Sequence, residues 1–534
     1  MDNTEQLEEE IGAAGDENVS TTAEGKKRFA QNTASSITFF AYTAVTSLLM
    51  VPYLIGRLGV ANYGMITLAN QFISITQVIT VVIVGTVTRF VMLHAAKGDN
   101  ETAKRYFSTQ YTAIVYLVAI LLPAAGAISY FAPSLVKIPP GQKLNTQLLF
   151  FFCYVAFVPS LFISPLQVGQ YIKQRFDVRN LLEMTNQAFR YDTWILLFAV
   201  MSPALWQVGI GYVAGASAAL IGTWISLVKL TPQLKPKFGI FDKRKFYEMT
   251  QMGGWVSVNQ VGSMLYLSVD ALVINRLMGP ASVGKYGTLL GLLAMLRVMS
   301  GLMSGMMMPL TISYFARNDI PGLIRNSAKA VKFMSLGMAV PLGLTCGLVI
   351  PFITWWLGPE FASLWPVAWL LLAPQVWNSS MEPLFAINNA ANKVAIPGVA
   401  AVVGGLIKLI LAIVLVKYTR MGLVGVALAN LIAFGLKNIV FTPIYAAHIL
   451  NSSSMPFYKA TIPSILVFAV TAGGAWWVTQ ILDISTFVRI VGTGLVLLLF
   501  FGLLVYRFAM NDEDRRFLDQ VAPWKKKGSA AKQI

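Results

Sequence analysis

Four cationic side chains are predicted to lie at membrane depth, and they carry the most informative chemistry of this chain. Arg297, Arg190, Lys408 and Lys437 each fall inside a long apolar segment. A cation near the bilayer centre costs roughly 2.5–3.5 kcal/mol on insertion scales, so four of them facing lipid would cost on the order of 10–14 kcal/mol. We therefore expect them to face water, counter-ions or an anionic ligand, and Arg and Lys are natural partners of phosphate groups.

Carboxylates that could act as counter-ions lie in the same apolar segments, at Asp192, Asp270 and Glu382. Buried ion pairs that only fix helix packing are one interpretation of the cations. Snorkelling toward an interface is another, above all for Lys437, which is nearer a segment end. Arg297 is the first candidate for binding an anion, and Asp270 and Glu382 are candidates for binding a coupling cation.

Polar side chains recur at helical spacing along three apolar segments, which places each set on one helix face. The sets are Asn32, Ser36, Thr43 and Ser47 in segment 30–55; Asn70, Ser74 and Gln77 in segment 63–89; and Asn259, Ser263, Tyr266 and Asp270 in segment 251–276. Polar stripes of this kind suit a water-filled cleft. Small polar residues that let helices pack closely are the alternative interpretation.

The elements that must position these residues are membrane-spanning helices. The chain is 56% hydrophobic and 12% charged, with a mean hydropathy of +0.63, whereas an average soluble domain is roughly 25% charged. A span needs about 20 apolar residues, and about fourteen segments qualify. They are 30–55, 63–89, 108–130, 147–170, 181–201, 207–229, 251–276, 285–312, 331–357, 364–388, 397–416, 422–447, 460–481 and 487–507. The sequence therefore predicts an all-α polytopic membrane protein.

An internal repeat divides the predicted spans into two lobes. Arg57-Leu-Gly-Val-Ala-Asn-Tyr63-Gly64 is echoed by Arg276-Leu-Met-Gly-Pro-Ala-Ser-Val-Gly-Lys-Tyr286-Gly287, and each turn joins two apolar segments. An even number of spans separates the copies, which predicts two pseudo-symmetric six-helix lobes in parallel orientation, followed by two C-terminal helices. The predicted parts are a disordered tail at 1–28, lobes at 29–230 and 251–448, a linker at 231–250, the last two spans at 459–508 and a basic tail at 509–534.

The distribution of charge sets the expected topology. The net charge is +17 with 41 Lys and Arg, and most of these residues fall in segments that would lie on one side of the membrane. The positive-inside rule then places both termini in the cytoplasm. Most of the charge is thus topological and secondarily attracts anionic lipid, so no nucleic acid partner is expected.

Catalytic and cofactor motifs do not account for this chain. Gly279 to Tyr286 nearly fits a phosphate-binding loop, but Tyr286 stands where Ser or Thr should bind magnesium, and no soluble strand precedes the loop. Cys153 and Cys346 lie in separate spans, and no His/Cys cluster or catalytic triad is visible, so we expect no metal, no cofactor and no catalytic residue. No loop is long enough for a folded extramembrane domain of about 50 residues.

The Arg-Leu-Gly-x-x-x-Tyr-Gly turn, its echo at Tyr286-Gly287 and the fourteen-segment layout resemble the polysaccharide transporter family. These proteins are flippases for polyprenyl-pyrophosphate-linked O-antigen and related repeat units, in the superfamily that also holds lipid II flippases and multidrug and toxin extrusion transporters. The resemblance implies two six-helix lobes around a cationic central cavity, alternating access, and a bacterial inner-membrane location. It also implies a role in lipopolysaccharide, capsule or exopolysaccharide synthesis, with membrane lipids and other polysaccharide assembly proteins as partners.

The resemblance also suggests where a pyrophosphate would bind. Lipid II flippases use arginines of spans 1, 2 and 8, and Arg297 matches the span 8 position in kind. Arg89 lies at the inner end of span 2, while Arg57 lies at the outer end of span 1, so span 1 has no internal arginine. Arg190, Lys408 and Lys437 complete the candidate anion-binding set.

Two other functions fit the composition less well. A multidrug-type cation antiporter on the same fold would need an anionic cavity, yet the first four predicted spans contain no internal acid. A membrane glycosyltransferase or polymerase acting on lipid-linked sugars would need a substantial loop with catalytic groups, and no such loop is present. The sequence therefore favours a flippase that is not an enzyme.

Overall fold

The computed structural model describes residues 23–510, apart from 85–86, 306–310, 312–313, 316 and 392. Within these residues all regular elements are helices, and ten are long and apolar enough to cross a membrane. The predicted all-α polytopic membrane protein is therefore confirmed. The predicted tails at 1–28 and 509–534 lie largely outside the described residues, but residues 23–28 are helical because α2 already begins at Ala23.

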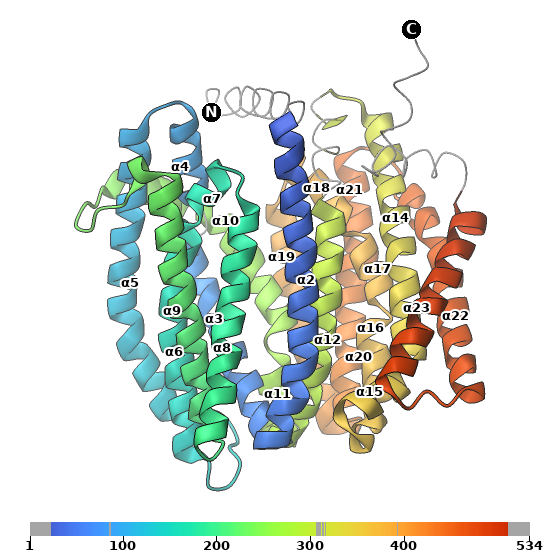
Figure 1. The fold of residues 1–534 in the computed structure, drawn as a ribbon. Coiled ribbons are helices and arrows are strands. Elements are labelled where there is room, and N and C mark those ends of the chain that lie inside the picture. The colour runs from blue at the N-terminus through green and yellow to red at the C-terminus, as the bar shows by residue number, and fades with distance from the viewer. Residues whose placement is uncertain are drawn as a thin grey trace. The chain divides into compact units, whose positions relative to one another are not determined.

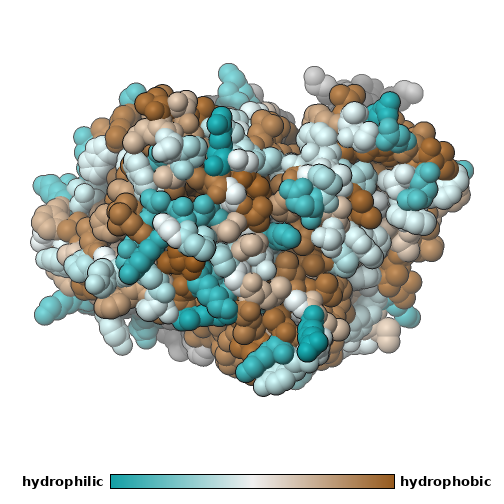
Figure 2. Space-filling model, turned by 90° about the horizontal axis from the view of Figure 1, so that it is seen from below, coloured by the Kyte–Doolittle hydropathy of each residue, from teal (hydrophilic) through white to brown (hydrophobic). Residues whose placement is uncertain are grey.

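Large apolar side chains on the helix surfaces are consistent with a lipid environment. Val200, Leu466 and Phe508 are among the many that are largely exposed, and a soluble protein seldom exposes so much contiguous apolar surface. Seen from below, the end face of the molecule carries hydrophilic side chains interspersed with hydrophobic ones (Figure 2). This pattern is what a bilayer-embedded bundle requires.

The chain divides into two compact units, residues 1–257 with 279–284, and residues 258–278 with 285–534. In each unit the long helices run side by side (Figure 1). The first unit contains α2 (Ala23–Leu58), α3 (Val60–Val84), α4 (Val87–Ala96), α5 (Asn100–Leu135), α6 (Lys143–Leu166), α7 (Val168–Ile172), α8 (Phe176–Val200), α9 (Leu205–Leu230), η1 (Pro232–Leu234) and most of α10 (Lys243–Leu267).

The second unit contains the end of α10, then α11 (Asp270–Met278), most of α12 (Pro280–Gly305), α14 (Ile320–Gly347), α15 (Val349–Leu357), η2 (Pro359–Leu364), α16 (Trp365–Leu372), α17 (Gln375–Ser380), η3 (Glu382–Leu384), α18 (Phe385–Ala390), α19 (Ala395–Tyr418), α20 (Leu423–Phe434), η4 (Gly435–Phe441), α21 (Thr442–Ile449), α22 (Met455–Ile481), α23 (Phe487–Leu504) and η5 (Val505–Ala509). Four predicted spans are interrupted within the described residues: the fourth at Gln167 between α6 and α7, the ninth at Leu348 between α14 and α15, and the seventh and tenth more extensively. The seventh breaks between α10 and α11, and the tenth is a succession of short helices from α16 to α18. Broken helices of this kind are typical of transporters, where the freed backbone groups are satisfied by protein or water.

The segment predicted as a linker, 231–250, is held against α5 in the first unit. The backbone N–H groups of Lys237 and Asp242 donate hydrogen bonds to Ser108 Oγ and Thr109 Oγ1 at 3.0 and 3.2 Å. Lys243 then starts α10. The polar residues at the start of α5 therefore fix the path of the chain before it enters the second unit.

The backbone repeats itself at the spacing that the sequence predicts. Gly59 and Gly279 have φ of +85° and +93°, a left-handed region that favours glycine, and each directly precedes a long helix. Asp99 and Asp319 cap α5 and α14 with almost the same backbone angles, each accepting a hydrogen bond from the N–H three residues on. Both pairs are about 220 residues apart.

Two further glycines show how the doubled turn is aligned. Within the first unit, a Cβ on Gly64 would collide with the carbonyl oxygen of Pro280, and a Cβ on Gly284 would collide with that of Val60. Gly64 and Gly284 thus play reciprocal parts, so the structural counterpart of Gly64 is Gly284 rather than the Gly287 of the sequence echo. The contact needs glycine at both places because two backbones approach directly.

Candidate functional site

A buried ion pair lies in the second unit between the first residue of α11 and the middle of α19. Lys408 Nζ is 2.8 Å from Asp270 Oδ1 and 2.9 Å from Oδ2. The Tyr286 hydroxyl donates to Asp270 Oδ2 at 2.8 Å, and Lys408 also donates to the backbone oxygen of Tyr266. Lys408 is only 1% exposed. The ammonium group that was predicted to bind an anionic ligand is therefore already neutralised by a carboxylate of the protein.

The break between α10 and α11 makes this pair possible. Asp270 stands at the N-terminus of α11, where free backbone N–H groups and the helix dipole favour a negative charge. The same break frees the carbonyl of Tyr266 to accept a hydrogen bond from Lys408. Two residues of the polar stripe that the sequence predicts on this segment, Tyr266 and Asp270, thus take part in the buried site around Lys408.

Arg297 and Lys437 lie in the same unit without such a partner. The Arg297 guanidinium is 5.6 Å from the centre of the Phe434 ring, and Lys437 Nζ is 5.3 Å and 5.8 Å from the rings of Tyr266 and Phe385. Both cations are half-buried, and among the described residues no carboxylate lies within 4.0 Å of either. Aromatic faces stabilise a cation by about 0.5–2 kcal/mol, which leaves its charge available to an anion.

Tyr266 connects these cations through its ring. It packs 4.6 Å from the Phe434 ring and donates its hydroxyl to the carbonyl of Ala433 at 3.3 Å. A Cβ on Gly404 would collide with this hydroxyl, so α19 needs a glycine here. Lys437 itself lies in η4, a π-helical turn, and such turns occur frequently at functional sites.

A third cation without a carboxylate within 4.0 Å in the described residues lies in the first unit, where Arg190 of α8 is enclosed by aromatic rings. Its guanidinium is 4.7 Å from the ring of Tyr191, 5.7 Å from Trp194 and 5.3 Å from Tyr212. Arg190 donates to the Tyr191 hydroxyl at 3.0 Å, and its buried Nε has no hydrogen-bond partner in the described part of the chain. Asn70 of α3 donates to the Tyr212 hydroxyl at 2.9 Å. We call Arg190 and these three rings the Arg190 box.

Two glycines of α9 let the Arg190 box form. A Cβ on Gly211 would collide with the indole of Trp194, and a Cβ on Gly215 would collide with the backbone oxygen of Asn186. Gly211 and Gly215 form a small-xxx-small pair, the motif that brings membrane helices into close contact. The close approach of α8 to α9 places Tyr212 beside Arg190.

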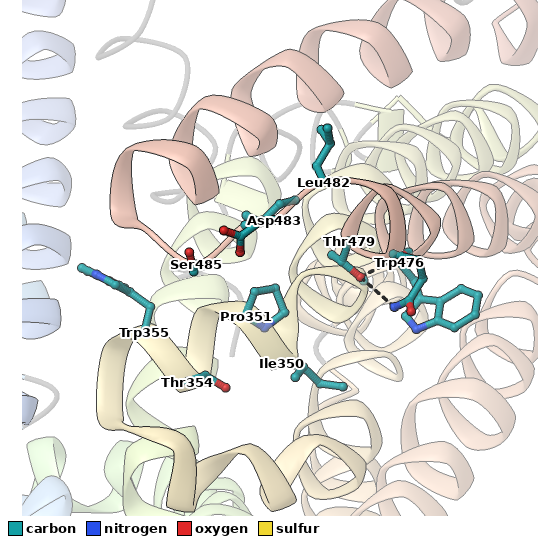
Figure 3. A pocket seen from close by; sticks show the side chains of 12 residues that line it. Ile350, Pro351, Thr354, Trp355, Trp476, Thr479, Leu482, Asp483 and Ser485 are labelled. Atoms are coloured by element: carbon teal, nitrogen blue, oxygen red, sulfur yellow. Dashed lines mark hydrogen bonds between the residues drawn. The ribbon is translucent and has the colours of Figure 1, made fainter.

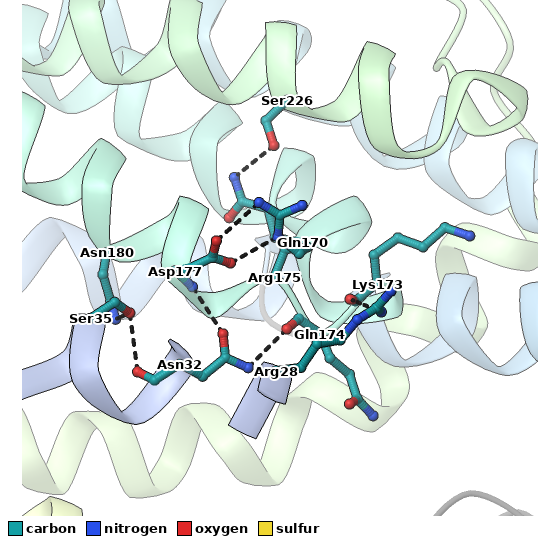
Figure 4. Close-up of polar contacts among 10 residues, drawn as sticks. All are labelled: Arg28, Asn32, Ser35, Gln170, Lys173, Gln174, Arg175, Asp177, Asn180 and Ser226. Atoms are coloured by element: carbon teal, nitrogen blue, oxygen red, sulfur yellow. Dashed lines mark hydrogen bonds and ion pairs between the residues drawn. The ribbon is translucent and has the colours of Figure 1, made fainter. Parts of the chain in front are cut away.

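The predicted stripe on α2 meets a matching stripe on α8, and we call this contact the α2–α8 seam. Asn180 donates to the hydroxyls of Ser35 and Ser36 at 2.8 and 3.0 Å, and Gln187 donates to Thr43 Oγ1 at 3.0 Å. At the end of the seam Asn32 donates to the Gln174 backbone oxygen at 2.9 Å and accepts from the Asp177 N–H at 3.2 Å (Figure 4). The Arg175 guanidinium hydrogen-bonded to Asp177 holds the pKa of that carboxyl below its ordinary value.

The remaining predicted residues are more scattered. Glu382 is half-buried on η3, and Ser263 is half-buried on α10. Ser74 donates to the Asn70 backbone oxygen one turn earlier, Gln77 is exposed, and Arg89 is exposed on α4. The Asn259 side chain lies outside the described residues. Asp192, predicted as a counter-ion, is exposed and makes no ion pair with Arg190 within the described residues.

Sequence reasoning missed the aromatic partners of the cations. Tyr191 and Trp194 follow Arg190 at i+1 and i+4, and the i+4 spacing is a signal that was available. Tyr212 and Phe434 come from other helices, so no local pattern indicates them. Asn180 and Gln187 recur at helical spacing on α8, as the residues of the α2 stripe do on their own helix, and could have been found in the same way.

Comparisons with known proteins agree with this architecture. The family described as "Polysaccharide biosynthesis protein" matches residues 29–314. The uncharacterized membrane protein EpsK of Bacillus subtilis (strain 168) is 28% identical over 494 residues, which cover 92% of this chain and 97% of that protein. The lipid II flippase MurJ in an inward closed conformation has a TM-score of 0.62 at 15% identity, covering 90% of this chain and 99% of that one. An inward-facing multidrug resistance MATE family transporter of the MOP superfamily has a TM-score of 0.51 at 14% identity, covering 76% and 99%. At these identities the solved structures show a shared fold.

Proposed function

This chain belongs to the polysaccharide biosynthesis protein family, and from that premise we propose that it is a flippase for a polyprenyl-pyrophosphate-linked oligosaccharide. The cargo would be a repeat unit of O-antigen, capsule or exopolysaccharide, moved from the cytoplasmic to the outer leaflet by alternating access. The protein would lie in a bacterial inner membrane with both termini in the cytoplasm, a topology supported by its Lys and Arg distribution. Membrane lipids and other polysaccharide assembly proteins would be its neighbours.

The observation that carries this proposal is the contrast among the membrane-depth cations. Lys408 is paired with Asp270, whereas Arg190, Arg297 and Lys437 face aromatic rings and have no carboxylate within 4.0 Å in the described part of the chain. An unpaired charge at this depth is costly unless something else compensates it. A pyrophosphate carries about two negative charges and accepts charge-assisted hydrogen bonds from guanidinium groups.

The membrane potential would assist such a reaction. An inside-negative potential favours outward movement of an anion by roughly 2.3 kcal/mol per charge per 100 mV, or about 4–5 kcal/mol for two charges. Asp270 and Glu382 remain candidates for coupling to a cation. Asp270 would have to exchange Lys408 for that cation, so Glu382, which makes no ion pair within the described residues, is the more accessible of the two.

The same contrast argues against cation export on this fold. A cation antiporter needs a carboxylate that is free for its cargo, and in the second unit Asp270 is neutralised by Lys408, so only Glu382 is left for that role among the buried and half-buried carboxylates described there. In the first unit Asp192 is exposed on the helix surface, and the cation Arg190 is the half-buried charge beside it. An anionic cargo matches this charge pattern better.

The test is transbilayer movement of a polyprenyl-pyrophosphate oligosaccharide in proteoliposomes that contain the full-length protein. Arg190→Ala and Arg297→Ala should each lower the initial rate at least tenfold, which corresponds to about 1.4 kcal/mol. Arg105→Ala is the matched control because Arg105 is an exposed arginine on α5, and it should transport at the wild-type rate. All variants are compared at equal amounts of monodisperse protein.

Two results would overturn the proposal. Wild-type protein that moves no such lipid but exports organic cations against a proton gradient would make it an antiporter. Normal transport by the Arg190→Ala, Arg297→Ala double variant would show that the two arginines do not bind the cargo.

A further inference from the structure

A pocket of about 390 Å³ lies in the second unit, away from the ion pair and the aromatic-faced cations. It is lined by the C-terminal end of α14, by α15, by the end of α22 and by the loop 482–486 before α23 (Figure 3). Ligand pockets in proteins are typically about 300–1,000 Å³. The predicted flippase mechanism makes no use of this pocket.

Two tryptophans lie at opposite ends of the pocket (Figure 3). Trp355 of α15 is 37% exposed, and Trp476 of α22 is 53% exposed. The Trp355 ring is held in place by the Phe487 ring, with centroids 4.7 Å apart. Gly347 forms part of the wall, and a Cβ there would press against α22 at Ala475 and Trp476. The Trp355 ring is therefore held in place before any ligand arrives, which lowers the cost of binding.

Polar groups line the space between the tryptophans. Arg489 donates to the Asp483 backbone oxygen at 3.0 Å and to Asp483 Oδ2 at 3.1 Å. Among the described residues nothing else bonds this carboxylate, so Oδ1 is available to a ligand. Ser485 lies on the same loop, and Thr354 lies across the pocket on α15 (Figure 3). The pocket thus combines an oriented carboxylate with hydroxyl groups on two sides.

The charge distribution places this pocket on the outer side of the membrane under the expected topology. The opposite, N-terminal end of α14 carries the basic residues Arg325, Lys329 and Lys332, whereas Glu360 and Asp483 lie at the pocket end. Basic residues mark the cytoplasmic side. The pocket would therefore open where a flipped substrate arrives.

This combination of groups matches a sugar ring. A pyranose has a C–H face that packs on an aromatic ring, whose face is electron-rich, and hydroxyl groups at its rim that donate to a carboxylate in charge-assisted hydrogen bonds. Tryptophans that only anchor a protein at the membrane interface need neither a cavity nor a carboxylate. The adjacent Trp477 fits that anchoring role, since it is 62% exposed and does not line the pocket.

We propose that this pocket binds a neutral hexopyranose unit on the outer side of the membrane, with Trp355 and Trp476 as stacking surfaces and Asp483 as the acceptor for its hydroxyls. That the bound sugar belongs to the translocated oligosaccharide rests on the proposed function. Binding of the sugar itself does not.

The test uses the full-length protein in nanodiscs and saturation-transfer NMR with methyl glucoside and methyl N-acetylglucosaminide as probes. Wild-type protein should bind at least one of them, and Trp476→Ala and Asp483→Asn should each weaken binding at least tenfold. Trp477→Ala is the matched control and should bind as the wild type does. Asp483 is largely exposed, so Asp483→Asn remains a valid probe even if Trp476→Ala fails to fold.

Three results would overturn the inference. They are no sugar binding by the wild type, equal binding by the wild type and the Asp483→Asn variant, or displacement of the sugar by glycerol 3-phosphate, which would assign the pocket to a lipid headgroup. The transport assay keeps the two proposals separate. Protein that flips lipid but binds no sugar contradicts only this inference, and protein that binds sugar but flips nothing contradicts only the proposed function.

Discussion

Arg190 in the first unit and Lys408 in the second are both cations at membrane depth, but the protein surrounds them differently. Lys408 is 1% exposed and touches both oxygens of Asp270. Arg190 is half-buried among three aromatic rings, with one buried N–H left without a partner in the described residues. The Lys408 site is complete without a ligand, whereas the Arg190 site is not.

This difference teaches that a buried cation is not by itself a sign of ligand binding. Removing a cation from water is costly, and either a carboxylate or aromatic rings can offset that cost. A carboxylate neutralises the charge, whereas aromatic rings stabilise it and leave the net charge in place. Only the second solution leaves a net charge for an anion. We therefore expect Lys408 to contribute to stability and Arg190 to transport.

The largest expected effect comes from opening the ion pair. Asp270→Asn would leave Lys408 buried without an anion, and breaking a buried pair in this way costs about 3–5 kcal/mol. We expect a marked fall in the midpoint of thermal unfolding in detergent, or loss of the monodisperse peak in size-exclusion chromatography. The double variant Asp270→Leu, Lys408→Met removes both charges and should recover most of the stability, which a double-mutant cycle would measure.

This experiment can also break the comparison. If Lys408→Met alone folds like the wild type but abolishes transport, then Lys408 binds cargo as Arg190 is proposed to do. The two sites would then differ in appearance only.

A smaller effect is expected when the Arg190 box is pushed apart. In the Gly211→Ala variant the new methyl group would collide with Trp194, and overpacking of this kind costs about 1–3 kcal/mol. Because the Trp194 ring is one of the three that contact Arg190, transport should fall while folded protein is still recovered. Gly126→Ala is the control, since a Cβ at Gly126 meets nothing within 4 Å. Unchanged transport by Gly211→Ala would mean that the box geometry does not matter.

Removing the central contact of the α2–α8 seam should have a weaker effect. Asn180→Ala loses two hydrogen bonds to serines of α2, and such bonds between membrane helices contribute about 0.6 kcal/mol each. The unfolding midpoint should fall slightly and the transport rate should hold. Thr185→Ala is the control because Thr185 bonds only within α8. A stable Asn180→Ala variant without transport would instead make the stripe a cargo contact.

The smallest effect concerns His94, a titratable group of intermediate exposure at the end of α4. Its ring stacks on Tyr106 at 5.3 Å, and Nδ1 lies 3.7 Å from Asp99 Oδ2. Burial lowers the pKa of His94 below its ordinary value, and the nearby Lys245 and Lys97 act in the same direction. Asp99 and Glu248 oppose this shift.

The sign of the pH dependence follows from that direction. A lowered pKa in the folded state means that folding favours the neutral ring, so the stability is present above the ordinary His pKa of about 6.5 and is lost as the pH falls through the folded value. Wild-type protein should lose slightly more thermal stability between pH 7.5 and 5.5 than His94→Phe, by less than about 2 °C. A larger loss in the variant would contradict this assignment.

Much of the fold was accessible from the sequence because membrane helices and tight turns have simple signatures. Apolar length predicts the spans, and the doubled motif predicts a repeated turn, at which the structure has a positive φ at Gly59 and at Gly279. The interruption before Asp270 carries no Gly or Pro, so nothing in the local sequence indicates it. The partner that Asp270 meets there is Lys408, which is more than a hundred residues away in the sequence.

The site was predicted only in part for the same reason. Apolar context identifies which cations are buried, but not which of Asp192, Asp270 and Glu382 approaches which cation. Pairing is decided by tertiary packing, and it left Asp192 on the surface while enclosing Asp270. Only the structure therefore shows that Lys408 is paired with a carboxylate and that Arg190 is not.

The π-helical turn that carries Lys437 has a consequence for insertions and deletions. A π turn holds one residue more than an α turn, so everything after Phe441 is rotated by about 100° relative to an uninterrupted α-helix. Two carbonyl oxygens of this turn accept hydrogen bonds from side chains outside it. The Thr442 hydroxyl donates to the carbonyl of Lys437, and the hydroxyl of Tyr458 on α22 donates to the carbonyl of Ile439. Deleting one residue here would restore an ordinary helix and remove Lys437 from the Tyr266 ring. A single extra residue therefore determines how far the side chains of α21 are rotated about the helix axis relative to those of α20, which includes Phe434.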